Sequence, residues 1–151
     1  MDAQAQLDSF LDRYTPEVAA DGRRALEFMR ARLPTATRLV YDNYNALVIG
    51  FGARPKAGDV IFSIALYPRY VTLFFARGVE LPDRHGVLEG GGKGVRHVKL
   101  RPISRLESPD VGALIDAAVA IATPPLSETG EGPLIIKSIS ATQRPRRPTS
   151  G

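Results

Sequence analysis

The chain has 151 residues, of which 44% are hydrophobic and 24% are charged, proportions typical of one globular domain. It contains no cysteine, which excludes disulfides, thiolate metal sites and cysteine nucleophiles. No apolar run approaches the roughly 18 residues of a membrane span, and the polar start MDAQAQLDSF lacks the pattern of a signal peptide, so we expect a cytoplasmic protein with no membrane partner.

The formal net charge of +4 is unevenly distributed along the chain. Residues 1–136 carry 16 Lys or Arg and 16 Asp or Glu, so this part is neutral. The excess positive charge comes from Lys137, Arg144, Arg146 and Arg147. We therefore predict a single domain over residues 1–140, followed by a basic, proline-rich tail over residues 141–151.

Three helices are predicted from apolar spacing and capping signals. A first helix has an apolar stripe of Leu7, Phe10, Leu11 and Tyr14. A second begins with Thr15 as the cap and Pro16 in the first helical position, and it ends before Pro34. A third repeats the same signal at residues 108–110 and ends before Pro124.

Alternating or continuous apolar runs predict strands at residues 47–52, 60–66, 71–75, 97–101 and 134–139. The first three are joined by links too short for a helical crossover, so they form an antiparallel meander. The second and third are apolar on both faces, which indicates one well-buried sheet face and a second that is partly covered. We expect an α+β fold with an antiparallel sheet of four or five strands, two N-terminal helices and one C-terminal helix, packed mainly on one face.

Two polar segments without periodicity are the candidate ligand site. Residues 41–45 (Tyr-Asp-Asn-Tyr-Asn) can order a turn or line a binding site. Residues 90–97 can form a glycine-rich anion-binding nest or a flexible turn into a strand. We place a candidate pocket for a small anionic ligand where the two meet; its residues are Tyr41, Asn43, Tyr44, Asn45, Lys93, Arg96 and His97.

No set of residues in the sequence forms a recognisable catalytic arrangement. The two histidines, His85 and His97, lack a partner motif, and no nucleophile has an evident base. The formal signatures of nucleotide-binding loops also fail at residues 89–94. We expect no catalytic residue and no cofactor, so a binding module for a small anion or a protein is favoured over an enzyme.

Several stretches resemble the YdhG-like domain family, a bacterial family of unknown function within a broader frataxin-like group. The resemblance spans about the whole chain and rests on residues 33–34, 40–45, 64–68, 71–75, 81–83, 88–90, 92–93, 95–97, 137–140 and 143–147. It implies a small α+β fold. Because a member is described as a frataxin-like iron chaperone, it also implies, as the alternative function, iron binding by acidic residues of the first helix, for which Asp8 and Asp12 are the nearest matches.

The basic tail has two interpretations. Its proline spacing favours an extended, mobile segment, and through it alone the chain could reach nucleic acid. Alternatively, the tail aids solubility or folds back on acidic residues of its own domain or of a partner in a homodimer. Four charges are a small footprint for a nucleic-acid arm, which favours the second interpretation.

Overall fold

One six-stranded sheet organises the molecule, and its strands lie in the order β5-β4-β3-β2-β1-β6. The computed structural model describes residues 1–149; residues 150–151 of the predicted tail lie outside the described part. The strands are β1 (Thr37–Asp42), β2 (Leu47–Gly52), β3 (Val60–Leu66), β4 (Val71–Phe75), β5 (Arg96–Lys99) and β6 (Leu134–Ile139). The helices are α1 (Ala3–Leu11), α2 (Pro16–Arg32) and α3 (Pro109–Ile121).

The α+β class is confirmed, but the sheet is mixed and has six strands rather than four or five antiparallel ones. β1 to β5 pair antiparallel, which the short links require for β1 to β4. β6 pairs parallel with β1, because the chain leaves β5, passes through α3 and returns to the opposite edge of the sheet. The sequence analysis missed β1, since the polar residues at its end were interpreted as a loop.

The predicted helix starts are confirmed. The Thr15 hydroxyl accepts a hydrogen bond from the Val18 amide at the start of α2, and the Ser108 hydroxyl accepts one from the Val111 amide at the start of α3. α2 continues through Gly22, where a Cβ would lie 2.5 Å from Leu66 Cδ2. Glycine at this position therefore lets α2 pack directly on β3.

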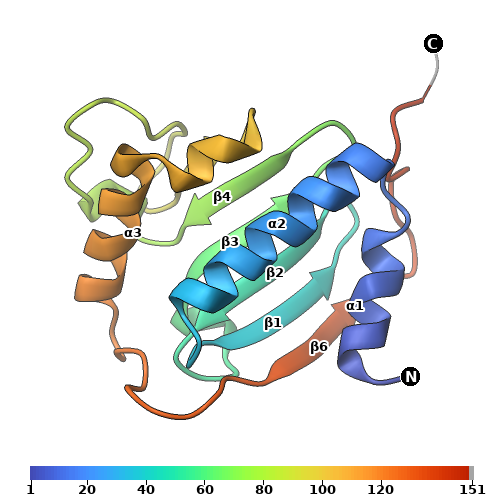
Figure 1. Ribbon diagram of the computed structural model, residues 1–151, viewed down its shortest axis with the longest axis horizontal. Coiled ribbons are helices and arrows are strands. Elements are labelled where there is room, and N and C mark those ends of the chain that lie inside the picture. The colour runs from blue at the N-terminus through green and yellow to red at the C-terminus, as the bar shows by residue number, and fades with distance from the viewer. Residues whose placement is uncertain (150–151) are drawn as a thin grey trace.

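The core fills the space between the helices and one face of the sheet, called here the inner face. In Figure 1, α2 lies across this face, α1 lies at the β6 edge on the right of the view, and α3 lies at the left. Adjacent positions of β1 to β5 place five buried side chains in one row of the core, namely Val40, Ile49, Ile64, Leu73 and Val98. None of the helices in residues 1–149 combines the length and apolar character needed to cross a bilayer.

The outer face of the sheet is half-buried, as the apolar pattern of β3 and β4 predicted. Val48, Val60 and Phe74 lie on this face and are only partly exposed. They line a groove of about 450 Å³, to which Tyr41 and Val95 also contribute.

Candidate functional site

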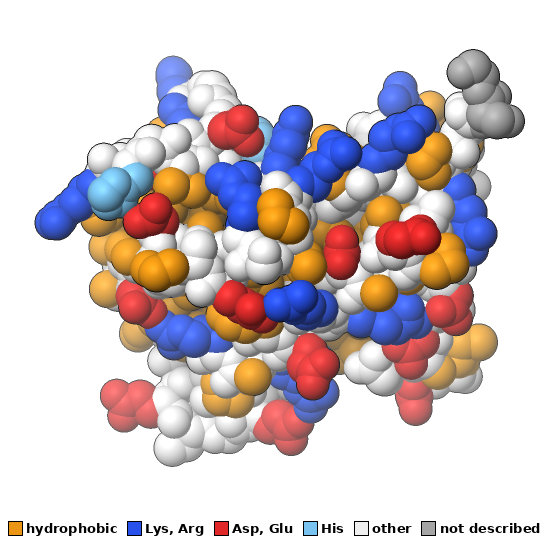
Figure 2. Space-filling model, turned by 45° about the horizontal axis from the view of Figure 1, so that its top comes forward, with side chains coloured by type: hydrophobic (Ala, Val, Ile, Leu, Met, Phe, Trp, Pro, Cys, Tyr) orange, Lys and Arg blue, Asp and Glu red, His pale blue; other side chains and the backbone are white. Residues whose placement is uncertain are grey.

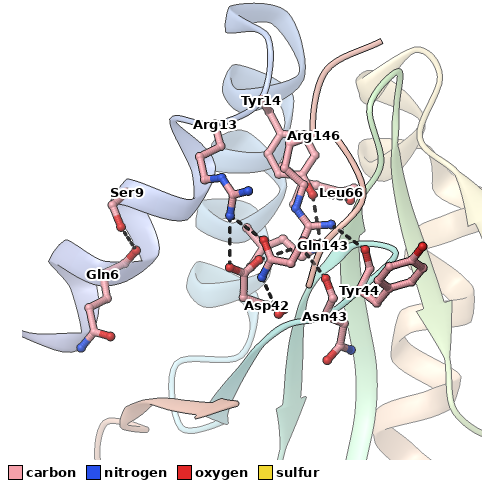
Figure 3. Close-up of polar contacts among 11 residues, drawn as sticks. Gln6, Ser9, Arg13, Tyr14, Asp42, Asn43, Tyr44, Leu66, Gln143 and Arg146 are labelled. Atoms are coloured by element: carbon pink, nitrogen blue, oxygen red, sulfur yellow. Dashed lines mark hydrogen bonds and ion pairs between the residues drawn. The ribbon is translucent and has the colours of Figure 1, made fainter. Parts of the chain in front are cut away.

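A buried ion pair joins the end of β1 to the C-terminal segment. Asp42, the last residue of β1, is 1% exposed, and Arg146 is 4% exposed. The Arg146 Nη2 group donates a hydrogen bond of 2.8 Å to Asp42 Oδ1, and Figure 3 shows the two side chains facing each other. Each group depends on the other, because a buried charge without a partner is strongly destabilising.

Further hydrogen bonds fix the same segment, residues 143–147, which we call the C-terminal clasp. Arg146 also donates to the Asn43 carbonyl at 2.5 Å and lies 3.5 Å from the Tyr44 carbonyl. The Gln143 amide donates to the Asp42 carbonyl at 2.9 Å. Arg13 Nη1 lies 3.6 Å from Asp42 Oδ2 and adds a second positive charge. The clasp therefore binds the end of β1 through backbone as well as side-chain contacts.

Tyr14 forms the floor beneath the clasp. Its ring is 1% exposed, and the Arg146 guanidinium lies 5.9 Å from the ring centroid. Its hydroxyl donates to the Leu66 carbonyl at 2.8 Å and accepts from the Leu47 amide at 3.1 Å. Burial raises the pKa of Tyr14, although the hydrogen bond from Leu47 opposes this shift. The neutral phenol thus ties α1 and α2 to the ends of β2 and β3.

The predicted extended, mobile tail is wrong for residues 143–147, because these residues pack on the domain. The structure agrees with the alternative in which the tail folds back on an acidic residue of its own domain, and that residue is Asp42. In Figure 1 the C-terminal segment lies beside the end of α1. The basic residues of the tail are therefore positioned by the fold.

A basic pocket of about 530 Å³ lies between the C-terminal segment and the turn that joins β3 to β4. Three arginines line it, Arg69 from the turn and Arg144 and Arg147 from the clasp, together with Asn45 and Tyr67. The remaining lining residues are Pro68, Pro145, Pro148 and Thr149, so no carboxylate side chain of residues 1–149 lines this pocket. Figure 2 shows Lys and Arg side chains gathered along the upper edge of the molecule, near the C-terminal segment.

Two of the pocket arginines, Arg144 and Arg147, are held by contacts that do not neutralise their charge. The Arg144 guanidinium lies 5.6 Å from the centroid of the Tyr44 ring, and its backbone amide donates to the Tyr44 carbonyl. Arg147 Nε donates to the Arg13 carbonyl at 3.1 Å. None of the three pocket arginines forms an ion pair with an Asp or Glu side chain of residues 1–149. The pocket therefore presents positive charge that the described protein does not neutralise.

Tyr67 adds a neutral polar group to the pocket. Its ring stacks on that of Tyr70, with centroids 5.3 Å apart. Burial raises the pKa of Tyr67, and Tyr70 adds to the effect. The phenol therefore stays protonated at neutral pH and is a hydrogen-bond donor suited to an anion.

The structure does not bring the two predicted segments together. β1 and β5 are separated by three strands, so they lie about 19 Å apart at the usual strand spacing. Asn43, Tyr44 and Asn45 form the turn beyond β1, whereas Lys93 and Arg96 lie toward the other end of β5. Only Tyr41 and Val95 share a surface, the groove on the outer face.

Residues 90–97 are occupied by contacts within their own loop. The Arg96 guanidinium donates to the carbonyls of Gly91, Gly92 and Val95, at 3.0, 3.0 and 2.8 Å. His97 lies against Phe74, and its Nε2 is 3.9 Å from Glu89. Lys93 is exposed. Arg96 thus closes the loop through its carbonyls.

The two acidic residues proposed for iron, Asp8 and Asp12, contact different partners. Asp12 forms an ion pair of 2.8 Å with Arg23, and Asp8 accepts a hydrogen bond from Gln4. Within residues 1–149, no group of three His, Cys, Asp or Glu side chains is arranged to hold a metal ion.

Sequence reasoning placed Asn45 in the site but missed Tyr67, Arg69, Arg144 and Arg147 as its partners. Arg144 and Arg147 were noted only as part of a basic tail. The signal that could have joined them was Asp42, a carboxylate two residues after Val40 and therefore on the same face of an apolar strand. A carboxylate at a core position requires a cation, and the tail holds the excess positive charge of the chain.

Comparisons with protein-family models, with curated proteins and with solved structures found no match to this chain.

Proposed function

We propose that this protein binds a small anion bearing a phosphate or carboxylate group in the basic pocket. The observation that carries the proposal is the convergence of Arg69, Arg144 and Arg147 on a pocket that no carboxylate side chain of residues 1–149 lines. Guanidinium groups form paired hydrogen bonds with phosphate and carboxylate oxygens, which makes arginine the preferred residue for such ligands. The Tyr67 hydroxyl and the Asn45 amide are further donors.

The clasp supports this proposal because it positions two of the three cations in advance. Arg146, which is held on the domain by its buried pair with Asp42, lies between Arg144 and Arg147 in sequence, so it fixes both neighbours on the domain. Prolines at 145 and 148 restrict the same backbone. A site that is ordered before the ligand arrives loses less conformational entropy on binding.

We also propose, from the sequence resemblance alone, that the chain belongs to the YdhG-like family.

Calorimetric titration with pyrophosphate and with citrate at low ionic strength tests the proposal. We expect saturable binding whose affinity falls as salt is added, because the attraction is between charges. Arg144→Gln together with Arg147→Gln is expected to weaken binding at least about a hundredfold, since each lost charge-assisted hydrogen bond removes about 1.5–3 kcal/mol.

Arg24→Gln is the matched control, because Arg24 is an exposed arginine of α2 whose ion pair with Glu107 lies outside the pocket. It is expected to leave the dissociation constant unchanged. Absence of binding by both anions, or an equal loss in the control and in the pocket variant, would overturn the proposal.

A further inference from the structure

A second cavity, separate from the basic pocket, lies between α1, α2 and the β1–β6 side of the sheet. Its volume is about 340 Å³, and it shares no lining residue with the basic pocket. Its apolar lining consists of Leu7, Leu11, Leu26, Ile49 and Leu134. We call this cavity the helix cleft; its lining can receive an aliphatic or aromatic group.

Arg38 brings a positive charge to the wall of the helix cleft. It lies in β1 on the inner face, and its side chain is half-buried. Its Nη2 group donates only a long hydrogen bond of 3.4 Å to the Gly132 carbonyl. No Asp or Glu side chain of residues 1–149 forms an ion pair with it, and the nearby Glu131 forms one with Arg30, at 2.6 Å. Burial, with a smaller effect of Arg30, lowers the pKa of Arg38, and the attraction of Glu131 opposes this shift only in part.

Two carboxylates line the same cleft without contacting Arg38. Asp8 of α1 accepts a hydrogen bond from Gln4, and Glu27 of α2 forms no ion pair within residues 1–149. The other cleft arginines are already paired, Arg23 with Asp12 and Arg30 with Glu131. Within residues 1–149, the helix cleft thus holds one cation and two carboxylates without an ion pair around an apolar floor.

We propose that the helix cleft binds an α-amino acid with an apolar side chain. Its carboxylate pairs with Arg38, its ammonium group pairs with Asp8 and Glu27, and its side chain contacts Leu7, Leu11 and Leu26. A zwitterion supplies both charges that the cleft lacks, whereas a simple anion or a simple cation supplies one and meets repulsion from the other. This site does not depend on the anion proposed for the basic pocket.

Calorimetry on the full chain, with L-leucine and three analogues, tests the proposal. Glycine lacks the apolar side chain, N-acetyl-L-leucine lacks the ammonium charge, and L-leucinamide lacks the carboxylate. We expect L-leucine to bind and each analogue to bind at least about tenfold more weakly. N-acetyl-L-leucine and L-leucinamide each lose one charge-assisted contact, and glycine loses the burial of the apolar side chain. Absence of L-leucine binding at millimolar concentration, or equal binding of N-acetyl-L-leucine, overturns the proposal.

Variants assign the binding to the helix cleft. Arg38→Gln is expected to weaken L-leucine binding at least about tenfold while pyrophosphate binding stays unchanged. Asp8→Asn, at a partly exposed position, is expected to weaken L-leucine binding severalfold, and it provides a second variant should Arg38→Gln fail to fold. Arg32→Gln is the control, because Arg32 pairs with Asp116 outside the cleft. Unchanged L-leucine affinity in both Arg38→Gln and Asp8→Asn overturns the proposal, and loss of pyrophosphate binding alone overturns only the anion site.

Discussion

Arg146 and Arg38 are both withdrawn from water, yet the protein treats their charges differently. Arg146 is 4% exposed and meets the Asp42 carboxylate at 2.8 Å. Arg38 is half-buried and meets only the Gly132 carbonyl, at 3.4 Å. The first charge is neutralised within the fold and holds the C-terminal clasp. The second is left for a ligand, so loss of Arg146 should affect stability and loss of Arg38 should affect binding.

Asp42→Asn is expected to give the largest effect on stability. It removes the carboxylate and leaves the Arg146 guanidinium buried without a countercharge, which lowers the free energy of unfolding by about 3–5 kcal/mol. Urea unfolding followed by circular dichroism measures the loss. Arg24→Met, which breaks an exposed pair with Glu107, should cost only about 0–1 kcal/mol. Equal losses in these two variants would show that the buried pair has no special role.

Tyr14→Phe is expected to give the next largest effect. The substitution removes a hydroxyl that serves two buried backbone groups, the Leu66 carbonyl and the Leu47 amide. Leaving them without a partner costs about 1–3 kcal/mol in the same urea experiment. Tyr44→Phe is the matched control, because Tyr44 is 48% exposed and its loss of a hydroxyl should change stability by less than about 0.5 kcal/mol. An unchanged free energy of unfolding in Tyr14→Phe would contradict the stabilising role of the Tyr14 hydroxyl.

Alkaline pH should weaken the protein through the same residue. Because burial raises the pKa of Tyr14 above its ordinary value of 10.0, the folded state keeps this proton when the unfolded state loses it. The contribution is complete below the unfolded pKa and is lost as pH rises through the folded pKa. Urea unfolding between pH 9 and about pH 11 should show a smaller decline in Tyr14→Phe than in the natural chain. If stability falls equally with pH in both proteins, the ionisation of Tyr14 does not cause the loss.

Arg38→Met is expected to give the smallest effect on stability. The substitution removes a half-buried charge that has no ion pair within residues 1–149, so there is little Coulomb energy to lose and some desolvation cost to regain. The free energy of unfolding should change by no more than about 1 kcal/mol. A loss as large as that of Asp42→Asn would mean that Arg38 serves the fold rather than a ligand.

Local signals in the sequence predicted much of the fold. Thr15 and Ser108 marked the starts of α2 and α3, because capping chemistry depends only on neighbouring residues. The short links likewise fixed the antiparallel pairing of β2, β3 and β4. Local patterns could not reveal β1, whose last residue, Asp42, is buried against Arg146, a residue 104 positions away.

The candidate site could hardly be predicted from the sequence, because it is formed almost entirely by contacts between distant residues. Asn45, Arg69 and Arg144 come together because two turns and the clasp meet at one end of the sheet. The sequence contained each residue but not the order of the strands in the sheet. β6 illustrates this, because no local pattern predicted its parallel pairing with β1.

The order of the C-terminal clasp is the central claim, because the clasp supplies Arg144 and Arg147 to the basic pocket. Backbone ¹⁵N relaxation of Gln143, Arg144, Arg146 and Arg147 tests it directly, with the amides of β1 as the rigid reference. The buried pair between Arg146 and Asp42 predicts order parameters close to those of β1, about 0.85. Values below about 0.6 at these four amides, with β1 remaining rigid, would show that the segment is free and would contradict the account.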